Sequence, residues 1–177
     1  KRKIKVIYNP AAIGKSFTNL NNLIDSKKMW GKGYNTHILA IGSLRKNKDF
    51  ITLIKAFSLL KDSLKAKLVI LGEGNERKAL ENLIKKLNLQ DRVLLPGFII
   101  NPYPWYLSAN LFVMSSKLEG FGNVIVEALE CGVPIVSTRC GGPIEILDNG
   151  CYGKLTPIGD EKIMAETIET SINEKYD

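Results

Sequence analysis

The sequence predicts an α/β protein with a Rossmann-like, doubly wound parallel sheet, and three observations support this prediction. Short apolar segments alternate along the chain with segments whose apolar residues recur at helical spacing. The short segments are continuously apolar, as is typical of parallel strands that are buried on both faces. Glycine-containing turns follow several of these strands, and right-handed crossovers would bring such turns to one edge of the sheet, where ligands bind.

Length and composition predict a single domain over residues 1–177, because 45% of the residues are hydrophobic and 24% are charged. The chain begins without Met and inside a strand-like pattern, so we expect it to be an excised piece of a longer protein. It contains no signal peptide pattern and no apolar run of about 18 residues, so no membrane-spanning segment is expected. Three cysteines without metal-binding spacing favour a reduced, cytoplasmic setting.

The net charge of +7 comes mostly from lysine. Solvated helix faces are the simplest interpretation, and a phosphate-rich ligand or an anionic membrane surface is the alternative. Nucleic acid is not expected as a partner, because the sequence has no aromatic-interleaved basic strand and no zinc or helix-turn-helix pattern.

The first expected element is a short strand at residues 5–8, which Asn9-Pro10 ends. Residues 11–35 are polar and irregular, so we expect a long loop with one helical turn near residues 20–24. Trp30 would anchor this loop to the body of the domain.

A second strand is expected at residues 37–44, followed by a helix that Asp49 would cap. The apolar face of this helix contains positions 50, 53, 54, 57 and 60. His37, the only histidine, lies at the start of the strand and far from the phosphate turn described below. We therefore interpret it as a hydrogen-bonded histidine at the sheet edge rather than as a catalyst.

The third expected strand, residues 67–71, runs into Gly72-Glu73-Gly74, and Asn75 is expected to cap the helix that follows. Further strands are expected at residues 92–95, 111–114, 135–137 and 153–155. Further helices are expected at residues 102–109, from Asn123 to the Gly132-Val133-Pro134 stop, at 144–147 and at 161–173.

The turn Glu119-Gly120-Phe121-Gly122-Asn123 joins the strand at residues 111–114 to a helix, and the rest of the chain is organised around it. Its glycines let the backbone turn tightly and approach a ligand, and the helix N-terminus offers N–H groups to an anion. Glu119 precedes the turn and Glu127 lies about one helical turn beyond it. Two carboxylates beside an anion site suggest recognition of hydroxyls next to a phosphate, as a sugar nucleotide requires.

Glu119 and Glu127, placed around Gly-Phe-Gly and followed by Ala-Leu-Glu-Cys-Gly-Val-Pro, resemble the acidic signature of glycosyltransferase family 4. Members of this family are retaining enzymes of the GT-B fold. The resemblance implies that Glu119 lies at the transferred sugar, as a catalytic residue, and Glu127 at the ribose hydroxyls. It also implies donor contacts from the turn residues Gly120, Phe121, Gly122 and Asn123.

Residues 42–48, Gly-Ser-Leu-Arg-Lys-Asn-Lys, resemble the family's Gly-Arg-Leu…Lys segment, in which Arg and Lys clamp the diphosphate. Gly42 and Lys48 match, and the resemblance gives Lys48 a catalytic role at the leaving group. Ser43 stands where the arginine is expected. Arg45 lies two residues on and would point the same way in an extended backbone, so it is the candidate replacement at the donor. Simple solvation is the alternative for Arg45 and Lys46.

Other positions match the family less specifically. Gly72 and Gly74 would let the chain approach the donor closely, or would form a structural turn. Phe98 lies where the family places the nucleotide base, although packing in the core is an alternative for its ring. Gly141-Gly142-Pro143-Ile144-Glu145 matches a Gly-Gly-x-x-Glu turn near the sugar, in which we interpret Glu145 as structural.

No metal and no other cofactor is expected, since the sequence has no Asp-x-Asp motif. The helix N-terminus and Lys48 would stabilise the diphosphate instead. The family's active-site histidine belongs to the N-terminal half of the enzyme, which the resemblance implies is not part of this sequence.

The resemblance implies a hexosyltransferase that moves a sugar from a nucleotide diphosphate sugar to an acceptor hydroxyl with retention, in cell-surface glycan or glycolipid synthesis. This chain would be its C-terminal, donor-binding half, inactive alone and partnered by an N-terminal acceptor domain. A lipid-linked acceptor would bring the full enzyme to the cytoplasmic face of the membrane. Front-face displacement and double displacement with Glu119 as nucleophile both stay open, as do the donor base and sugar.

Three alternatives remain. A sugar-nucleotide epimerase or phosphorylase of GT-B fold is less favoured, because the Glu-Gly-Phe-Gly…Glu-Ala segment matches family 4 better. A non-catalytic nucleotide-binding module is the second alternative. The third, an interaction domain without a ligand, leaves Lys48 and the two-acid turn unexplained. Stabilisation of the chain by UDP, GDP or ADP would separate the nucleotide-binding interpretations from the third.

Overall fold

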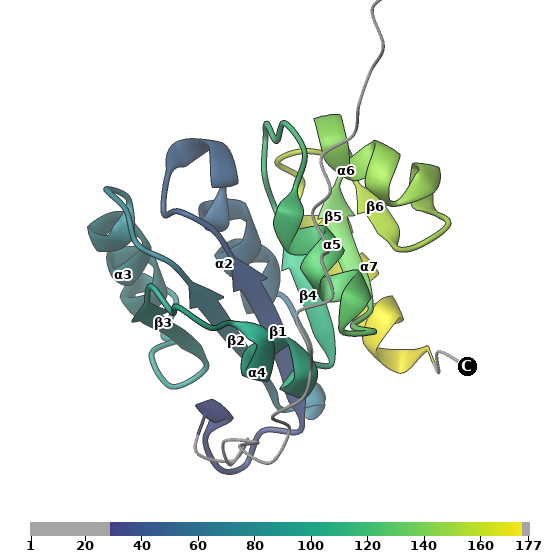
Figure 1. Cartoon of the computed structure of the whole chain (residues 1–177). Helices are drawn as coiled ribbons and strands as arrows, with labels where there is room; N and C mark the ends of the chain where they lie inside the picture. The colour runs from purple at the N-terminus through teal and green to yellow at the C-terminus, as the bar shows by residue number, and fades with distance from the viewer. Residues whose placement is uncertain (1–28, 175–177) are drawn as a thin grey trace, which may run out of the picture.

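A computed structural model describes residues 29–174 of the chain. Its centre is a six-stranded sheet with the order β3-β2-β1-β4-β5-β6, in which all neighbouring strands run parallel (Figure 1). The predicted Rossmann-like α/β class is therefore confirmed. The strand predicted at residues 5–8 and the helical turn near residues 20–24 lie outside the described residues.

The strands are short and apolar, and most of their residues are buried. They are β1 (Thr36–Ile41), β2 (Ala66–Leu71), β3 (Val93–Gly97), β4 (Leu111–Met114), β5 (Ile135–Thr138) and β6 (Lys154–Thr156). Strand β1 pairs with β2 on one side and with β4 on the other. The strand order therefore reverses between β1 and β4, which is the switch point where ligands of open α/β sheets bind.

Helices cover both faces of the sheet (Figure 1). One face packs against α2 (Phe50–Ser58), α3 (Arg77–Lys86) and α7 (Glu161–Asn173). The opposite face packs against α4 (Tyr103–Ser108), α5 (Asn123–Glu130) and the region of α6 (Gly141–Ile146). Short 3-10 helices η2 (Lys46–Lys48), η3 (Asp62–Leu64) and η4 (Asp148–Gly150) lie in the connections.

Successive strand residues serve opposite halves of the core, which explains why the strands are continuously apolar. In β1, Ile38 and Ala40 face the α2 side, whereas Leu39 faces the α5 side. In β4, Val113 and Phe112 divide in the same way. Full burial of each large apolar side chain contributes about 1.5–3 kcal/mol, so apolar residues on both faces of a strand stabilise the fold.

Trp30 confirms the predicted anchor at the start of the described residues. Its ring is fully buried, and its Nε1 donates a hydrogen bond to Ser108 Oγ at 2.9 Å. The ring also stacks on His37 with a centroid distance of 4.6 Å. A nitrogen of His37 lies 3.1 Å from the Ser108 carbonyl oxygen, so the histidine is hydrogen-bonded at the strand start, as predicted.

The predicted helix caps are partly wrong. Asp49 occupies the N-cap position of α2, but its carboxylate accepts from the Thr52 hydroxyl at 2.7 Å and from no backbone N–H of the helix. The N-cap of α3 is Glu76 rather than Asn75, because the chain makes a turn before the helix begins. Asp160, which the sequence analysis overlooked, caps α7 by accepting from the backbone N–H groups of Lys162 and Ile163.

Two glycines allow the loops at the carboxyl ends of the strands to touch. A Cβ atom on Gly72 would lie 1.9 Å from the Gly42 carbonyl oxygen, and one on Gly142 would lie 2.2 Å from the Phe121 carbonyl oxygen. The close approach made by Gly72 is therefore to the neighbouring loop, which supports the structural interpretation of this turn. Helix α6 begins at Gly141, earlier than predicted, because this glycine pair packs directly against residues 119–121.

We predict that Gly142→Ala lowers the free energy of unfolding by about 2–3 kcal/mol, since the added methyl overlaps the backbone at Phe121. Gly120→Ala is the matched control. A Cβ atom at Gly120 meets nothing within 4 Å, so this change should be neutral or stabilising by about 0.5 kcal/mol. Urea unfolding of both variants measures the difference, and equal stabilities would contradict the predicted packing of the two loops.

Candidate functional site

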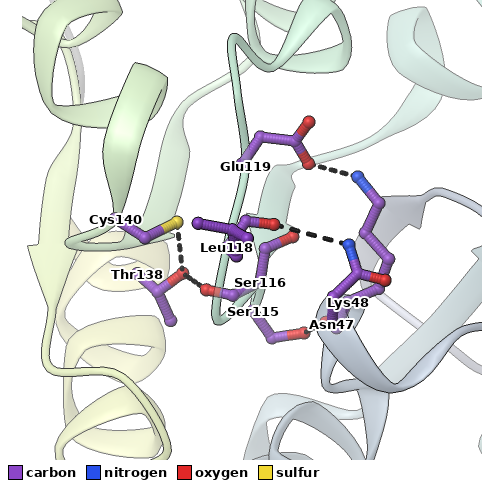
Figure 2. Close-up of polar contacts among 8 residues, drawn as sticks. All are labelled: Asn47, Lys48, Ser115, Ser116, Leu118, Glu119, Thr138 and Cys140. Atoms are coloured by element: carbon purple, nitrogen blue, oxygen red, sulfur yellow. Dashed lines mark hydrogen bonds and ion pairs between the residues drawn. The ribbon is translucent and has the colours of Figure 1, made fainter.

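The loops that follow β1 and β4 are tied together across the switch point. The Lys117 N–H donates to the Asn47 carbonyl at 2.7 Å, and the Ser115 hydroxyl donates to the Lys48 carbonyl at 2.8 Å. The Asn47 side chain adds a longer hydrogen bond to the Leu118 carbonyl at 3.4 Å (Figure 2). These bonds hold the 3-10 helix η2 next to the segment that contains Glu119.

Lys48 and Glu119 form an ion pair over this junction (Figure 2). The lysine comes from η2 and the glutamate from the loop after β4, and the two side chains are only 17% and 18% exposed. The structure thus brings together the two residues that were predicted to be catalytic. The ammonium group has three hydrogens, so it can bind Glu119 and a second anion at the same time.

The loop after β5 supports Glu119 from the other side. Gly142 N–H donates to the Glu119 carbonyl at 3.2 Å, and the Thr138 hydroxyl donates to the Ser116 carbonyl at 2.6 Å (Figure 2). Cys140 lies beside Thr138, and burial raises the pKa of its thiol, which favours a neutral packing role. Hydrogen bonds with the loops after β1 and β5 therefore hold the loop that carries Glu119.

Ser115, Ser116 and Thr138 were not predicted as site residues, although each is fully buried at the end of a strand. Two hydroxyls bond to backbone carbonyls of a neighbouring loop, whereas Ser116 Oγ is buried without a hydrogen-bond partner among the described residues. The sequence signal that could have identified these residues is the presence of small hydroxyl side chains at the end of an apolar strand.

The N-terminus of α5 lies within this site. Gly122 occupies its N-cap with φ of 101°, a conformation that favours glycine, and no side chain caps the helix. No capping side chain therefore satisfies the first-turn N–H groups of α5. Anion binding at this turn, with Gly120, Phe121 and Asn123 as the neighbouring residues, stays a prediction.

Glu127 lies one turn into α5 and is partly buried. Its Oε2 accepts a hydrogen bond from the Tyr106 hydroxyl at 3.0 Å. No described lysine or arginine pairs with this carboxylate, in contrast to Glu119. The two acids of the signature therefore differ in environment, since one is neutralised by a cation and the other is bonded to a neutral hydroxyl.

The turn at Gly72, Glu73 and Gly74 is held by an arginine that the sequence analysis did not single out. Arg77 binds Glu73 with two hydrogen bonds of 2.9 and 2.6 Å and also donates to the Leu95 carbonyl. The hydrogen bond from Arg77 lowers the pKa of Glu73. Contact of Gly72 or Gly74 with a donor remains a prediction.

Phe98 follows β3 and its side chain is 73% exposed. The suggestion that its ring packs in the core is therefore wrong. Gly97 precedes it with φ of 97° and ends the strand, so the chain leaves the sheet before the ring can reach the interior. The exposed ring remains free to contact a ligand.

Arg45 was predicted to point the same way as Ser43 along an extended backbone. The Arg45 N–H donates to the Ser43 carbonyl at 2.8 Å, so this segment bends rather than extends. The side chain lines a separate cleft of about 190 Å³ outside the Lys48–Glu119 pair. The residues around this cleft are Arg45, Lys46, Asp49, Phe50, Ile51, Glu76, Leu80 and Lys117. The extended backbone that was assumed for residues 43–45 is interrupted at Leu44, where the hydrogen bond to the Ser43 carbonyl closes a tight turn, and contact of Arg45 with a donor stays a prediction.

Metal-binding side chains do not gather in the part of the chain that the structure describes: residues 29–174 contain no cluster of three or more His, Cys, Asp or Glu suited to a metal ion. Burial and the charges of Glu130 and Glu127 raise the pKa of Cys131 to about 11, so this thiol stays protonated near neutral pH. Among the described helices, none has the length and apolar character needed to cross a membrane.

The fold and the site define a Rossmann-like α/β domain with a paired lysine and glutamate, and an uncapped helix N-terminus, at its switch point. The sequence profile of the family described as "Glycosyl transferases group 1" matches residues 25–176. The chain therefore belongs to the group 1 glycosyl transferases.

Curated relatives agree with this family. The chain is 39% identical over 138 residues to N-acetylgalactosamine-N,N'-diacetylbacillosaminyl-diphospho-undecaprenol 4-alpha-N-acetylgalactosaminyltransferase of Campylobacter jejuni, a match that covers 77% of this chain and 37% of the relative. It is 34% identical over 169 residues to the lipopolysaccharide core biosynthesis glycosyltransferase LpsE of Rhizobium meliloti, covering 96% and 47% of the two chains. The chain thus spans less than half the length of these relatives.

Solved structures show the same fold. HepE of Anabaena, in complex with UDP and glucose, superimposes with a TM-score of 0.79 at 28% identity, over 89% of this chain and 44% of HepE. WaaG, a glycosyltransferase of lipopolysaccharide biosynthesis, superimposes with a TM-score of 0.77 at 23% identity, over 95% and 46% of the two chains. Such neighbours are glycosyltransferases of GT-B fold, and this chain corresponds to about half of each.

Proposed function

We propose that this chain is the C-terminal, donor-binding domain of a retaining hexosyltransferase of glycosyltransferase family 4. The Lys48–Glu119 pair at the uncapped start of α5 is the observation that carries the proposal. It combines a cation for a diphosphate with an acid for a sugar at the edge where such sheets bind ligands. The donor would be a nucleotide diphosphate sugar, and the HepE complex with UDP and glucose supports UDP as the first nucleotide to test.

The acceptor domain would come from the part of the protein that the longer relatives contain and this chain does not. Relatives named for lipopolysaccharide core and undecaprenol-linked glycan synthesis support an acceptor in cell-surface glycan or glycolipid synthesis. A lipid-linked acceptor would place the full enzyme at the cytoplasmic face of the membrane.

In the proposed reaction, the bond between the anomeric carbon and the β-phosphate oxygen breaks, and a bond from that carbon to the acceptor hydroxyl oxygen forms. Lys48 and the α5 N-terminus would stabilise the negative charge that develops on the leaving diphosphate. In the front-face route, the acceptor proton passes to the departing phosphate oxygen. The pairing of Glu119 with Lys48 favours this route over double displacement, because an ion-paired carboxylate is a weaker nucleophile.

We predict that a nucleoside diphosphate binds the chain with a Kd of about 1 mM, because one wall of the cleft belongs to the other domain. At 10 mM such a ligand would stabilise the chain by about 1.4 kcal/mol, which raises Tm by about 3–5 °C. Thermal unfolding with UDP, GDP and ADP measures this effect and identifies the base. A chain that responds to none of them would refute the donor site.

We predict that Lys48→Ala weakens diphosphate binding by about 1.5–3 kcal/mol, since it removes a charge-assisted hydrogen bond from a partly buried site. Lys46→Ala, in the same 3-10 helix, and Arg45→Ala are matched controls that should each cost less than about 0.5 kcal/mol. Calorimetric titration of the three variants with UDP gives the comparison. A larger loss at Arg45 would show that the diphosphate lies in the other cleft.

We predict that the two acids serve different parts of the donor. Glu127→Gln should weaken UDP and its sugar conjugate alike by about 1–2 kcal/mol, because an amide offers one acceptor oxygen where a carboxylate offers two. Glu119→Gln should leave UDP affinity nearly unchanged, yet lower transfer by the full-length enzyme about a hundredfold. Equal losses of UDP affinity in the two variants would place both acids at the nucleotide.

A further inference from the structure

Tyr106 is a fully buried tyrosine whose hydroxyl lies beside Glu127. It belongs to α4 and packs its ring against Phe112 of β4, with a centroid distance of 5.5 Å. Its hydroxyl oxygen lies 3.0 Å from Glu127 Oε2 and 3.1 Å from the Val124 carbonyl oxygen. Both acceptors belong to α5, so the hydroxyl contacts the helix that carries Glu127, the acid that the proposed function places at the ribose.

The hydroxyl has a single hydrogen, and the carboxylate is its stronger acceptor. Burial and the charge of Glu127 raise the pKa of Tyr106 far above its usual range, so the hydroxyl stays protonated and donates at every working pH. A bond to a neutral hydroxyl holds Glu127 in place without neutralising it. A lysine partner would instead compete with an incoming ligand for the negative charge.

The element that carries Tyr106 is itself anchored to β1. The carbonyl oxygen of Ser108, the last residue of α4, lies 3.1 Å from a ring nitrogen of His37 in β1, and Asn110 exchanges hydrogen bonds with His37 through its side chain and its backbone N–H. The hydroxyl is therefore fixed relative to the switch point and not only relative to α5. Ordering the long Glu127 side chain costs rotamer entropy. Because the Tyr106 hydroxyl already orders this side chain in the free protein, less of that entropy would be lost when a ligand binds.

We infer that Tyr106 is a positioning residue that orients the Glu127 carboxylate toward the ribose hydroxyls of the nucleotide, an inference that rests on the proposed function of Glu127. The tyrosine occupies one lone pair of Oε2. The remaining lone pair of Oε2 and both lone pairs of Oε1 stay available to accept from two neighbouring hydroxyls. The tyrosine itself need not touch the ligand.

Tyr106→Phe tests this inference, because it deletes only the hydroxyl and retains the buried ring. Calorimetric titration with UDP should show binding weakened about five- to tenfold. Titration with 2′,3′-dideoxy-UDP, which lacks the ribose hydroxyls, should give the same affinity in the variant and the parent chain. In the Glu127→Gln background, Tyr106→Phe should add less than about twofold. Tyr34→Phe is the matched control, since it removes a hydroxyl that donates to the Asp91 carbonyl at 2.7 Å, remote from α5.

Other results of these titrations would contradict either the positioning role of Tyr106 or the proposed role of Glu127. Equal weakening of UDP and the dideoxy ligand would show that the hydroxyl only supports the fold, and thermal unfolding would then report the same loss without ligand. Unchanged UDP binding in Tyr106→Phe would refute the positioning role while the proposed function stands. A parent chain that binds both ligands equally, with Glu127→Gln silent, would refute the ribose role of Glu127 and the inference with it.

Discussion

The backbone contact between the loops after β1 and β4 is the constraint on which the site depends. Asn47 and Lys48 receive hydrogen bonds from Lys117 and Ser115, and this geometry places the Lys48 ammonium within reach of Glu119. The two loops are close only because β1 and β4 are neighbours in the sheet. The parallel pairing of β1 and β4 therefore brings the two loops into contact, and that contact in turn allows the ion pair between Lys48 and Glu119 to form.

Close contacts between other neighbouring strand-end loops explain why glycines recur at the strand ends. Gly72 packs against the Gly42 carbonyl, and Gly142 packs against Phe121. These contacts leave no volume for a side chain, so the glycines shape the rim of the site from within the protein. A glycine at a strand end is often explained by the close approach of a ligand. Here the packing of one loop on the next already requires glycine, and a ligand can impose the same requirement on the same residue.

Much of the fold could be predicted from the sequence, because continuously apolar strands and amphipathic helices report burial directly. The positions of Lys48, Glu119 and Glu127 on strand-end loops and a helix start were likewise readable from the motifs. The partners of these residues were not, since Lys48 and Glu119 are 71 positions apart and Tyr106 lies in a helix with no functional signature. The direction of Arg45 was not readable either, because a tight turn at Leu44 changes the path of the chain and the side chain lines another cleft.

The difference between the two acids follows from what faces each of them. A lysine beside Glu119 pairs with that carboxylate and also provides hydrogens for a phosphate, so under the proposed function this end suits the bond that breaks. A buried tyrosine beside Glu127 orients the carboxylate but leaves its charge available, so this end suits neutral hydroxyls. Exchanging the partners would weaken both functions, because a lysine would saturate the ribose acceptor and a tyrosine would leave the leaving group without a cation. The placement of one cation and one hydroxyl thus gives two chemically identical side chains different environments, and the proposed division of roles between them rests on that difference.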